Sequence, residues 1–223
     1  MEKLGDEIWT VTQPLKLGGA DFGTRMTVVR LGEELLLHSP VRIDDALAER
    51  LSGLGRVRWI AAPNTFHHLF AGRAKERWPE AEVLAAPGVE KKQRALPIDG
   101  ALPDAAPEAW RGALETLFVG GMPALNEVVF FHRPSKTLVL TDFLFNFGDE
   151  GGWWTRTVLS MAGARGGAKQ SRLLRFVMKD KEAVKRCRDE MLGWDFARAT
   201  VCHGDVIEGD AKDVVAKSTA WLG

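Results

Sequence analysis

The stretch IAAPNTFHHLFAG (60–72) decides how the whole sequence is interpreted. The apolar run that leads into it, 57–62, predicts a buried strand, and the residues after it, 68–78, predict a helix that ends before Pro79. Two consecutive histidines, His67 and His68, therefore stand at a strand-to-helix junction. Sites in layered α/β folds are commonly built from polar residues at strand ends, so this junction is a candidate site.

The segments around this unit alternate between strand and helix patterns. Strands are predicted over 7–14, 25–40 (two strands joined by a turn at Gly32), 56–62, 81–88, 127–132, 137–141 and 197–202. Helices are predicted over 42–55 (with Asp44 as the cap), 68–78, 169–178, 181–192 and from Asp210 onward. Antiparallel strand pairs come first in each half and helices follow. The sequence thus predicts an α/β sandwich with two sheets inside and helices outside.

Two stretches lack these patterns. Residues 90–112 are rich in Pro, Ala and charge, which predicts an excursion over the surface. Residues 145–169 are rich in glycine and predict a loop that carries Trp153 and Trp154. This loop is either a mobile lid over a pocket or an apolar segment that packs on the sheet edge.

Composition narrows the class of protein. The chain has 223 residues, which fits one domain, 1–223. Thirty Lys and Arg balance thirty Asp and Glu, so charge favours neither nucleic acid nor a membrane as partner, and a small molecule remains. Two cysteines argue against a disulfide framework and against cysteine-rich zinc modules, and no apolar run is long enough to span a membrane. A cytoplasmic protein is expected.

Residues with metal-ligand chemistry gather at predicted strand ends. His38, the pair His67 and His68, and His203 each follow a strand, and Asp142 directly follows the strand TLVLT. Imidazole and carboxylate groups from several strand ends make a metal-type constellation. We therefore expect a metal site if these ends converge.

The order of these motifs resembles the metallo-β-lactamase superfamily over nearly the whole chain. IAAPNTFHHLFAGRAKERWPEAEVLAAPG (60–88) stands where the superfamily has strand, HxHxDH, helix, strand and Pro-Gly. ELLLHSP (34–40), TLVLTDFLFN (137–146) and TVCHGDVIEG (200–209) are similar to its LLIDPG, TGDLLF and GHG segments. The chain looks like a divergent branch, and the resemblance implies a four-layer αββα sandwich with two mixed sheets.

The resemblance also implies that a first metal site is lost. The two histidines of HxH are replaced by Pro63 and Thr65, and the later turn histidine by Pro123 or a neighbour. In the superfamily these three histidines hold the first ion. A degenerate site that holds one ion at most is expected here.

The second metal site of the superfamily is largely retained. His67 stands in place of the motif aspartate, while His68, Asp142 and His203 keep their types. The resemblance therefore implies that His67, His68, Asp142 and His203 are the metal ligands, with His67 and Asp142 also catalytic. Three imidazoles and one carboxylate suit zinc or iron better than calcium or magnesium.

Two functions are compatible with a fold that keeps only the second metal site of the superfamily. The first is a metal-dependent hydrolase of an ester, lactone or phosphoester, with His67 as a ligand or a general base. The second is a non-catalytic module that binds a small molecule or a protein on the same fold, since the first-site histidines are gone. A redox site with one non-haem iron is a weaker third interpretation.

Four further residues are considered near the site. His38 replaces the LLIDPG aspartate and either supports the ligands or simply ends a strand. Glu127 either offers a carboxylate to the site or lies on the surface at the start of a strand. His132 is expected to be exposed beside a turn, and Cys202 to be a small buried strand residue.

Overall fold

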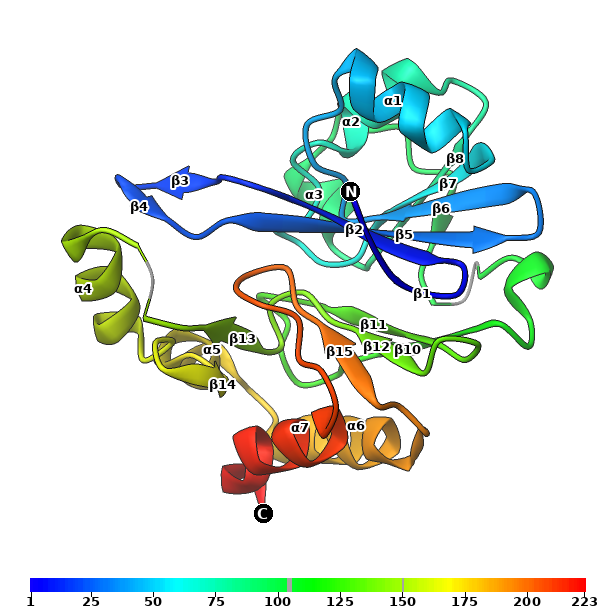
Figure 1. Ribbon diagram of the computed structural model, residues 1–223. Helices are drawn as coiled ribbons and strands as arrows, with labels where there is room; N and C mark the ends of the chain where they lie inside the picture. The colour runs from blue at the N-terminus through cyan, green and yellow to red at the C-terminus, as the bar shows by residue number, and fades with distance from the viewer. Residues whose placement is uncertain (104–105, 150) are drawn as a thin grey trace.

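Two β-sheets lie against each other at the centre of the molecule, and helices cover their outer faces (Figure 1). A computed structural model describes residues 1–103, 106–149 and 151–223. Across the first sheet the strands are β1 (Glu2–Gly5), β2 (Ile8–Gln13), β5 (Thr24–Leu31), β6 (Glu34–His38), β7 (Arg56–Ala62), β8 (Glu82–Ala85) and β9 (Gly100–Ala101). Across the second sheet they are β10 (Leu114–Phe118), β11 (Val128–His132), β12 (Thr137–Val139) and β15 (Arg198–Thr200).

Both sheets combine parallel and antiparallel pairs. In the first sheet β1, β2, β5 and β6 pair antiparallel, whereas β6 to β9 run parallel. In the second sheet β10, β11 and β12 form an antiparallel meander, and β12 pairs parallel with β15. The predicted pair of mixed sheets is confirmed.

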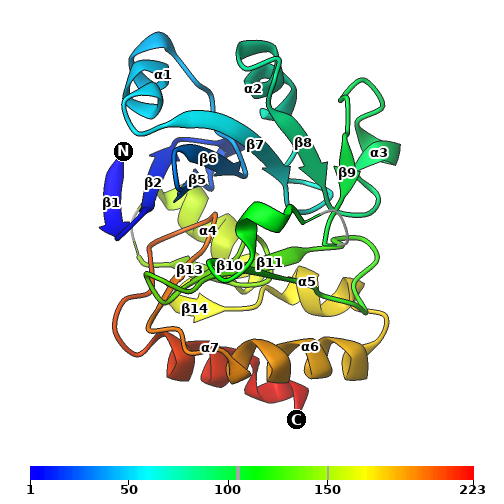
Figure 2. The same cartoon turned by 90° about the vertical axis from the view of Figure 1, so that its right-hand side faces the viewer.

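Helices form the two outer layers of the sandwich. Above the first sheet lie α1 (Asp45–Ser52) and α2 (Ala71–Arg77), and α3 (Val89–Lys92) follows β8. Beneath the second sheet lie α6 (Lys181–Gly193) and α7 (Ala211–Thr219), as Figure 2 shows from the side. The chain is thus a four-layer αββα sandwich, and no helix in its described part is long and apolar enough to cross a membrane.

Smaller elements gather at one end of the sandwich. They are the ribbon β3 (Lys16–Leu17) and β4 (Ala20–Asp21), the ribbon β13 (Phe145–Phe147) and β14 (Gly167–Lys169), and the helices α4 (Trp153–Ala162) and α5 (Arg172–Val177). Two short 3₁₀ turns, η1 (Glu108–Trp110) and η2 (Ala220–Leu222), complete the chain.

Strand β11 shows how the sequence builds the layers. Val128 and Phe130 belong to the apolar cluster around the first sheet, whereas Val129 and Phe131 belong to the cluster around α6 and α7. Successive side chains of a strand point to opposite faces, so one strand supplies both clusters. Both faces of the second sheet are therefore buried, as expected for an inner layer.

Local signals set several element ends as predicted. Asp44 caps α1, because its carboxylate accepts the backbone N–H of Leu47 at 2.8 Å. Gly32 has φ of 67° in the turn between β5 and β6, a left-handed conformation that glycine adopts readily.

The two stretches expected to be irregular are more ordered than predicted. Within 145–169, residues Trp153–Ala162 form α4, so the predicted loop is wrong there; the glycines lie at its ends, with Gly163 in the left-handed conformation that closes the helix. Within 90–112, Trp110 is buried and packs edge-on against Trp59, with ring centroids 5.8 Å apart. The prediction that 90–112 runs over the surface is therefore wrong at Trp110. Residues 104–105 of this stretch lie outside the described part of the chain.

Candidate metal centre

Two pairs of parallel strands bring the candidate residues to one place. In the second sheet Val139 of β12 pairs with Thr200 of β15, and Asp142 and His203 each lie three residues beyond these partners. In the first sheet β6 and β7 are parallel neighbours, and His67 lies in the turn after β7. The carboxyl ends of parallel strands meet at one sheet edge, so these segments converge.

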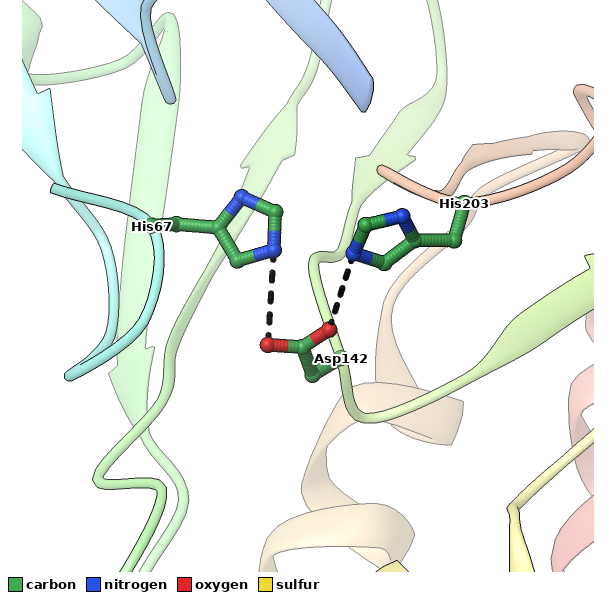
Figure 3. Close-up of side chains that lie close together, drawn as sticks. All are labelled: His67, Asp142 and His203. Atoms are coloured by element: carbon green, nitrogen blue, oxygen red, sulfur yellow. Dashed lines mark ion pairs between the residues drawn. The ribbon is translucent and has the colours of Figure 1, made fainter. Parts of the chain in front are cut away.

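The three side chains form a compact cluster (Figure 3). His67 Nε2 lies 3.3 Å from Asp142 Oδ2, and His203 Nε2 lies 3.3 Å from Asp142 Oδ1. One ligand atom from each residue lies within 4.8 Å of the other two. The structure thus brings together three of the four residues predicted as ligands, each of them largely buried.

Hydrogen bonds on the far side of each ring orient the two imidazoles. His203 Nδ1 donates to the carbonyl oxygen of Gly23 at 2.8 Å, since a carbonyl can only accept. His67 Nδ1 lies 2.8 Å from Ser39 Oγ, which follows β6. Both rings therefore present Nε2 to Asp142, the arrangement in which metal-binding histidines are usually held.

The geometry of the three groups suits a bound cation. The Nε2 atoms of His67 and His203 each face one carboxylate oxygen of Asp142 at 3.3 Å, while Nδ1 of His203 donates to the carbonyl oxygen of Gly23. The donor set of two imidazole nitrogens and one carboxylate therefore fits a zinc or iron ion.

The same charges shift the protonation equilibria of the cluster. Burial opposes ionisation of Asp142, but the positive charge of His67 and the hydrogen bonds from His203 and His67 hold its pKa well below the usual range. Burial alone would lower the pKa of His67, but the adjacent Cys202 sulfur and the Asp142 carboxylate raise it well above its ordinary value. Without an ion, His67 is thus an imidazolium that faces the carboxylate of Asp142.

Asn64 joins two of the three cluster residues. Its side-chain N–H groups donate to Asp142 Oδ2 and to Thr141 Oγ1, each at 2.9 Å. Its carbonyl oxygen accepts the backbone N–H groups of Phe66 and His67, each at 2.8 Å. Sequence analysis missed this residue, although an Asn in a turn shortly after a strand is a recognised signal for the local bonds to Phe66 and His67.

Glu127 holds the backbone on which Asp142 is carried. Its fully buried carboxylate accepts the backbone N–H groups of Thr141, Asp142 and Phe143 at 2.7, 2.9 and 2.8 Å. Burial, followed by the charge of Asp142, raises the pKa of Glu127 to about 7. The prediction of a surface residue is wrong, and its carboxylate binds the loop backbone.

His68 lies outside the three-residue cluster. It lines the cavity described below, and its Nδ1 is buried without a hydrogen-bond partner among the residues that the structure describes. Burial and the neighbouring Lys92 charge lower its pKa. Its role as a ligand stays a prediction.

Residues at the lost first site have other partners. Thr65 Oγ1 donates to the carbonyl oxygen of Ala124 at 2.7 Å, and Lys92 Nζ donates to the same hydroxyl at 3.2 Å. Lys92 Nζ also lies 3.6 Å from the centroid of the Phe66 ring. An ammonium group therefore lies beside one of the positions where the superfamily has a first-site histidine.

The remaining candidates differ in how well they were predicted. His38 ends a strand and packs edge-on against Phe130, and within the described part of the chain neither ring nitrogen has a hydrogen-bond partner. Its neighbour Ser39 contacts His67 instead. The expectation that His132 is exposed is wrong, because its buried ring bonds to Ser135 Oγ at 2.7 Å. Cys202 is buried, as predicted.

The cluster opens into a mainly apolar cavity of about 600 Å³. Its polar wall contains His67, Asp142, His203 and Lys92. Most other lining residues are apolar and come from β3, the turn after β7, β13 and α5. Trp153 and Trp154 do not line this cavity, and Trp154 instead donates to the carbonyl oxygen of Gly18 at 3.0 Å.

Solved structures show which fold this is. The chain is similar to a metallo-β-lactamase from Pontibacter korlensis, with 13% identity, a TM-score of 0.67, and 99% and 96% of the two chains covered. It is similar to the metallo-β-lactamase FIM-1 from Pseudomonas aeruginosa in the mono-zinc form, with 12% identity, a TM-score of 0.63, and 99% and 94% covered. The metal-soaked Flv1 flavodiiron core from Synechocystis is also similar, with 10% identity, a TM-score of 0.66, and 99% and 60% covered.

These likenesses establish the metallo-β-lactamase fold. A search of curated proteins gave no match to this sequence. A family model described as Domain of unknown function (DUF4336) matches residues 5–152, which include the turn after β7 and Asp142. The chain therefore belongs to the DUF4336 family, on a metallo-β-lactamase fold.

Proposed function

We propose that the protein is a metal-dependent hydrolase with a single ion held by His67, Asp142 and His203. One observation carries the proposal: two Nε2 atoms face the two oxygens of one carboxylate, each at 3.3 Å. The mono-zinc form of FIM-1, a structure of the same fold, supports the idea of a one-ion site. Zinc or iron matches this donor set better than calcium or magnesium.

Three protein ligands are a better basis for catalysis than four. Structural zinc sites are closed by four protein ligands, whereas catalytic sites have three and leave a position open. Because His68 lies outside the cluster, three protein side chains would hold the ion, and all three line the cavity. When bound, the ion supplies a Lewis acid that polarises an ester, lactone or phosphoester oxygen and lowers the pKa of water.

The protein residues position the reaction. Ser39 and the carbonyl of Gly23 fix the two imidazoles, and Asn64 fixes Asp142 relative to His67. The cavity wall is mainly apolar, so a bound substrate that covers it would displace water and strengthen the electrostatic interactions within the site. In the net reaction, the water oxygen bonds to the acyl carbon or phosphorus, the bond to the leaving oxygen breaks, and that oxygen takes a water proton.

A specific observation also favours the second candidate, a module that only binds a small molecule. Thr65 and Lys92 occupy part of the region that lacks the first-site histidines, and the cavity beside them is large and apolar. In this alternative no ion is bound at the cluster, and the cavity binds its ligand without turnover. The two functions differ in whether the cluster holds a metal.

Elemental analysis of tag-free protein, reconstituted with Zn²⁺ or Fe²⁺ and then desalted, tests the proposal. We expect close to one ion per chain in the parent and almost none in His203→Ala. His68→Ala is the matched control and should keep its ion, because His68 is not in the cluster. Thermal unfolding checks that each variant is folded. A folded parent that retains no ion would overturn the hydrolase and leave the binding module.

A further inference from the structure

The cavity beside the metal cluster has an apolar wall built from several separate segments. Leu15 and Leu17 come from the region of β3, Leu69 from the turn after β7, Phe145 from β13, and Leu173 and Leu174 from α5. The volume of about 600 Å³ lies within the range of about 300–1,000 Å³ typical of small-molecule sites. A ligand that fills this space must present mostly hydrocarbon to the wall.

The apolar wall continues to the protein surface. Leu17, Leu69 and Leu173 line the cavity but are 55%, 56% and 66% exposed. Large apolar side chains that stay in water around a pocket mark a surface that a ligand covers. An apolar part of a ligand could therefore be covered by this wall from the cluster side to the exposed leucines.

Lys92 gives the cavity wall a positive charge. Its Nζ contacts a hydroxyl, Thr65 Oγ1 at 3.2 Å, and the face of the Phe66 ring at 3.6 Å. Neither group carries a negative charge, so these contacts orient the ammonium without neutralising it. The other ionisable side chains in the described part of the wall are His67, His68, Asp142 and His203. An anionic group on the ligand is the natural partner of Lys92.

We propose that the cavity binds an amphiphile made of one alkyl or acyl chain and an anionic head group, and that the substrate is an acyl ester of this type. The chain lies against the leucine and phenylalanine wall, and the anionic group binds Lys92. This inference rests on the proposed function, since it names the substrate class of the same site.

The first test is a binding series by isothermal titration calorimetry with hexanoate, octanoate, decanoate and dodecanoate below their micellar concentrations. Each added methylene should lower Kd about fourfold, the factor that corresponds to about 0.8 kcal/mol per buried methylene. Dodecanoate should bind at least tenfold more tightly than dodecyltrimethylammonium, which has the same chain and the opposite charge. A flat chain-length series, or equal affinity for the two head groups, would overturn the proposal.

Variants separate the two parts of the ligand. Leu173→Ser should weaken dodecanoate more than hexanoate, whereas Met161→Ser, at an exposed apolar residue outside the cavity wall, should change neither. Lys92→Met should remove the preference for the anionic head group, and Lys92→Arg should keep it. A Lys92→Met protein that still prefers dodecanoate would overturn the role of Lys92.

Hydrolysis measured on the same preparations distinguishes the two proposals. p-Nitrophenyl acetate and p-nitrophenyl decanoate are supplied with and without the reconstituted ion. Metal-dependent hydrolysis of both esters with equal kcat/KM and no chain-length series in binding would overturn the substrate class and leave the hydrolase. A clear binding series with no metal and no turnover would support the amphiphile and overturn the hydrolase.

Discussion

The side-chain amide of Asn64 donates to Asp142 Oδ2 at 2.9 Å while its carbonyl oxygen accepts the backbone N–H of His67 at 2.8 Å. One fully buried side chain therefore fixes a carboxylate from the second sheet relative to an imidazole from the first. The cluster depends on the separation between Asp142 and His67. Asn64 is therefore expected to affect metal binding without contacting the ion itself.

Replacing Asn64 tests this relationship. Asn64→Ala should lower the affinity for Zn²⁺ or Fe²⁺ about 10–100-fold, the usual effect of removing a residue that orients metal ligands. The affinity is measured by competition with a chelator. Asn146→Ala is the control, since its side chain bonds to the carbonyl of Asp205 and not to the cluster. Equal affinities in the two variants would show that Asn64 does not position the ligands.

Gly204 follows His203 and leaves no room for a side chain. An added Cβ would lie 2.0 Å from the carbonyl oxygen of Asn146, and φ is 94°. Gly204→Ala should therefore displace His203 and reduce the bound metal, besides the cost of about 1–2 kcal/mol for a left-handed alanine. Gly209→Ala has a similar φ of 73° but open space, so it should lose stability only. Urea unfolding and elemental analysis measure the two effects.

Glu127 should stabilise the fold through the loop that carries Asp142. Glu127→Gln keeps one acceptor oxygen but turns an N–H₂ group toward backbone donors, which should cost about 1–3 kcal/mol of unfolding free energy. The control Glu115→Gln alters a partly exposed ion pair with Arg133 and should cost less than about 1 kcal/mol. Urea unfolding measures both changes. A smaller loss of unfolding free energy in Glu127→Gln than in Glu115→Gln would contradict this role of Glu127.

Buried His132 should make the fold sensitive to acid. Burial lowers the pKa of His132 to about 4 from an ordinary value of 6.5, so the unfolded chain binds more protons between these values. Stability contributed by the neutral ring is thus present above pH 6.5 and is lost as the pH falls toward 4, by up to about 3 kcal/mol.

The comparison variant for this effect is His132→Asn, which cannot titrate but can still reach Ser135. The difference in unfolding free energy between parent and variant should shrink or reverse as the pH falls from 6.5 to 4. Urea unfolding at a series of pH values measures it. Parallel curves for the two proteins would mean that His132 titrates normally.

Local patterns predicted the parts of the fold that depend on neighbouring residues. The strand that ends at Ala62, the cap at Asp44 and the turn at Gly32 were all predicted correctly, because each is set within a few positions of the chain. The strands that precede Asp142 and His203 were predicted from local patterns in the same way, and the structure has them as β12 and β15. The resemblance to a known superfamily then implied that these ends converge.

Interactions between distant residues could not be predicted in this way. Asn64 and Asp142 are 78 positions apart, and nothing near Asn64 indicates that its amide reaches a second sheet. Glu127 directly precedes β11, where a charged residue is usually exposed, but its partners are backbone groups of a later turn. The glycines around Trp153 indicated a loop, although they only delimit a helix.

The three cluster residues come from both central sheets, since His67 follows β7 while Asp142 and His203 follow β12 and β15. An ion at this point would join the two sheets, which are also linked here by hydrogen bonds such as those from Asn64 to Thr141 and Asp142. Amide exchange should then slow in β7 and β15 together when one ion binds. Binding of one ion at the edge of the sandwich would therefore change amide exchange inside both central sheets.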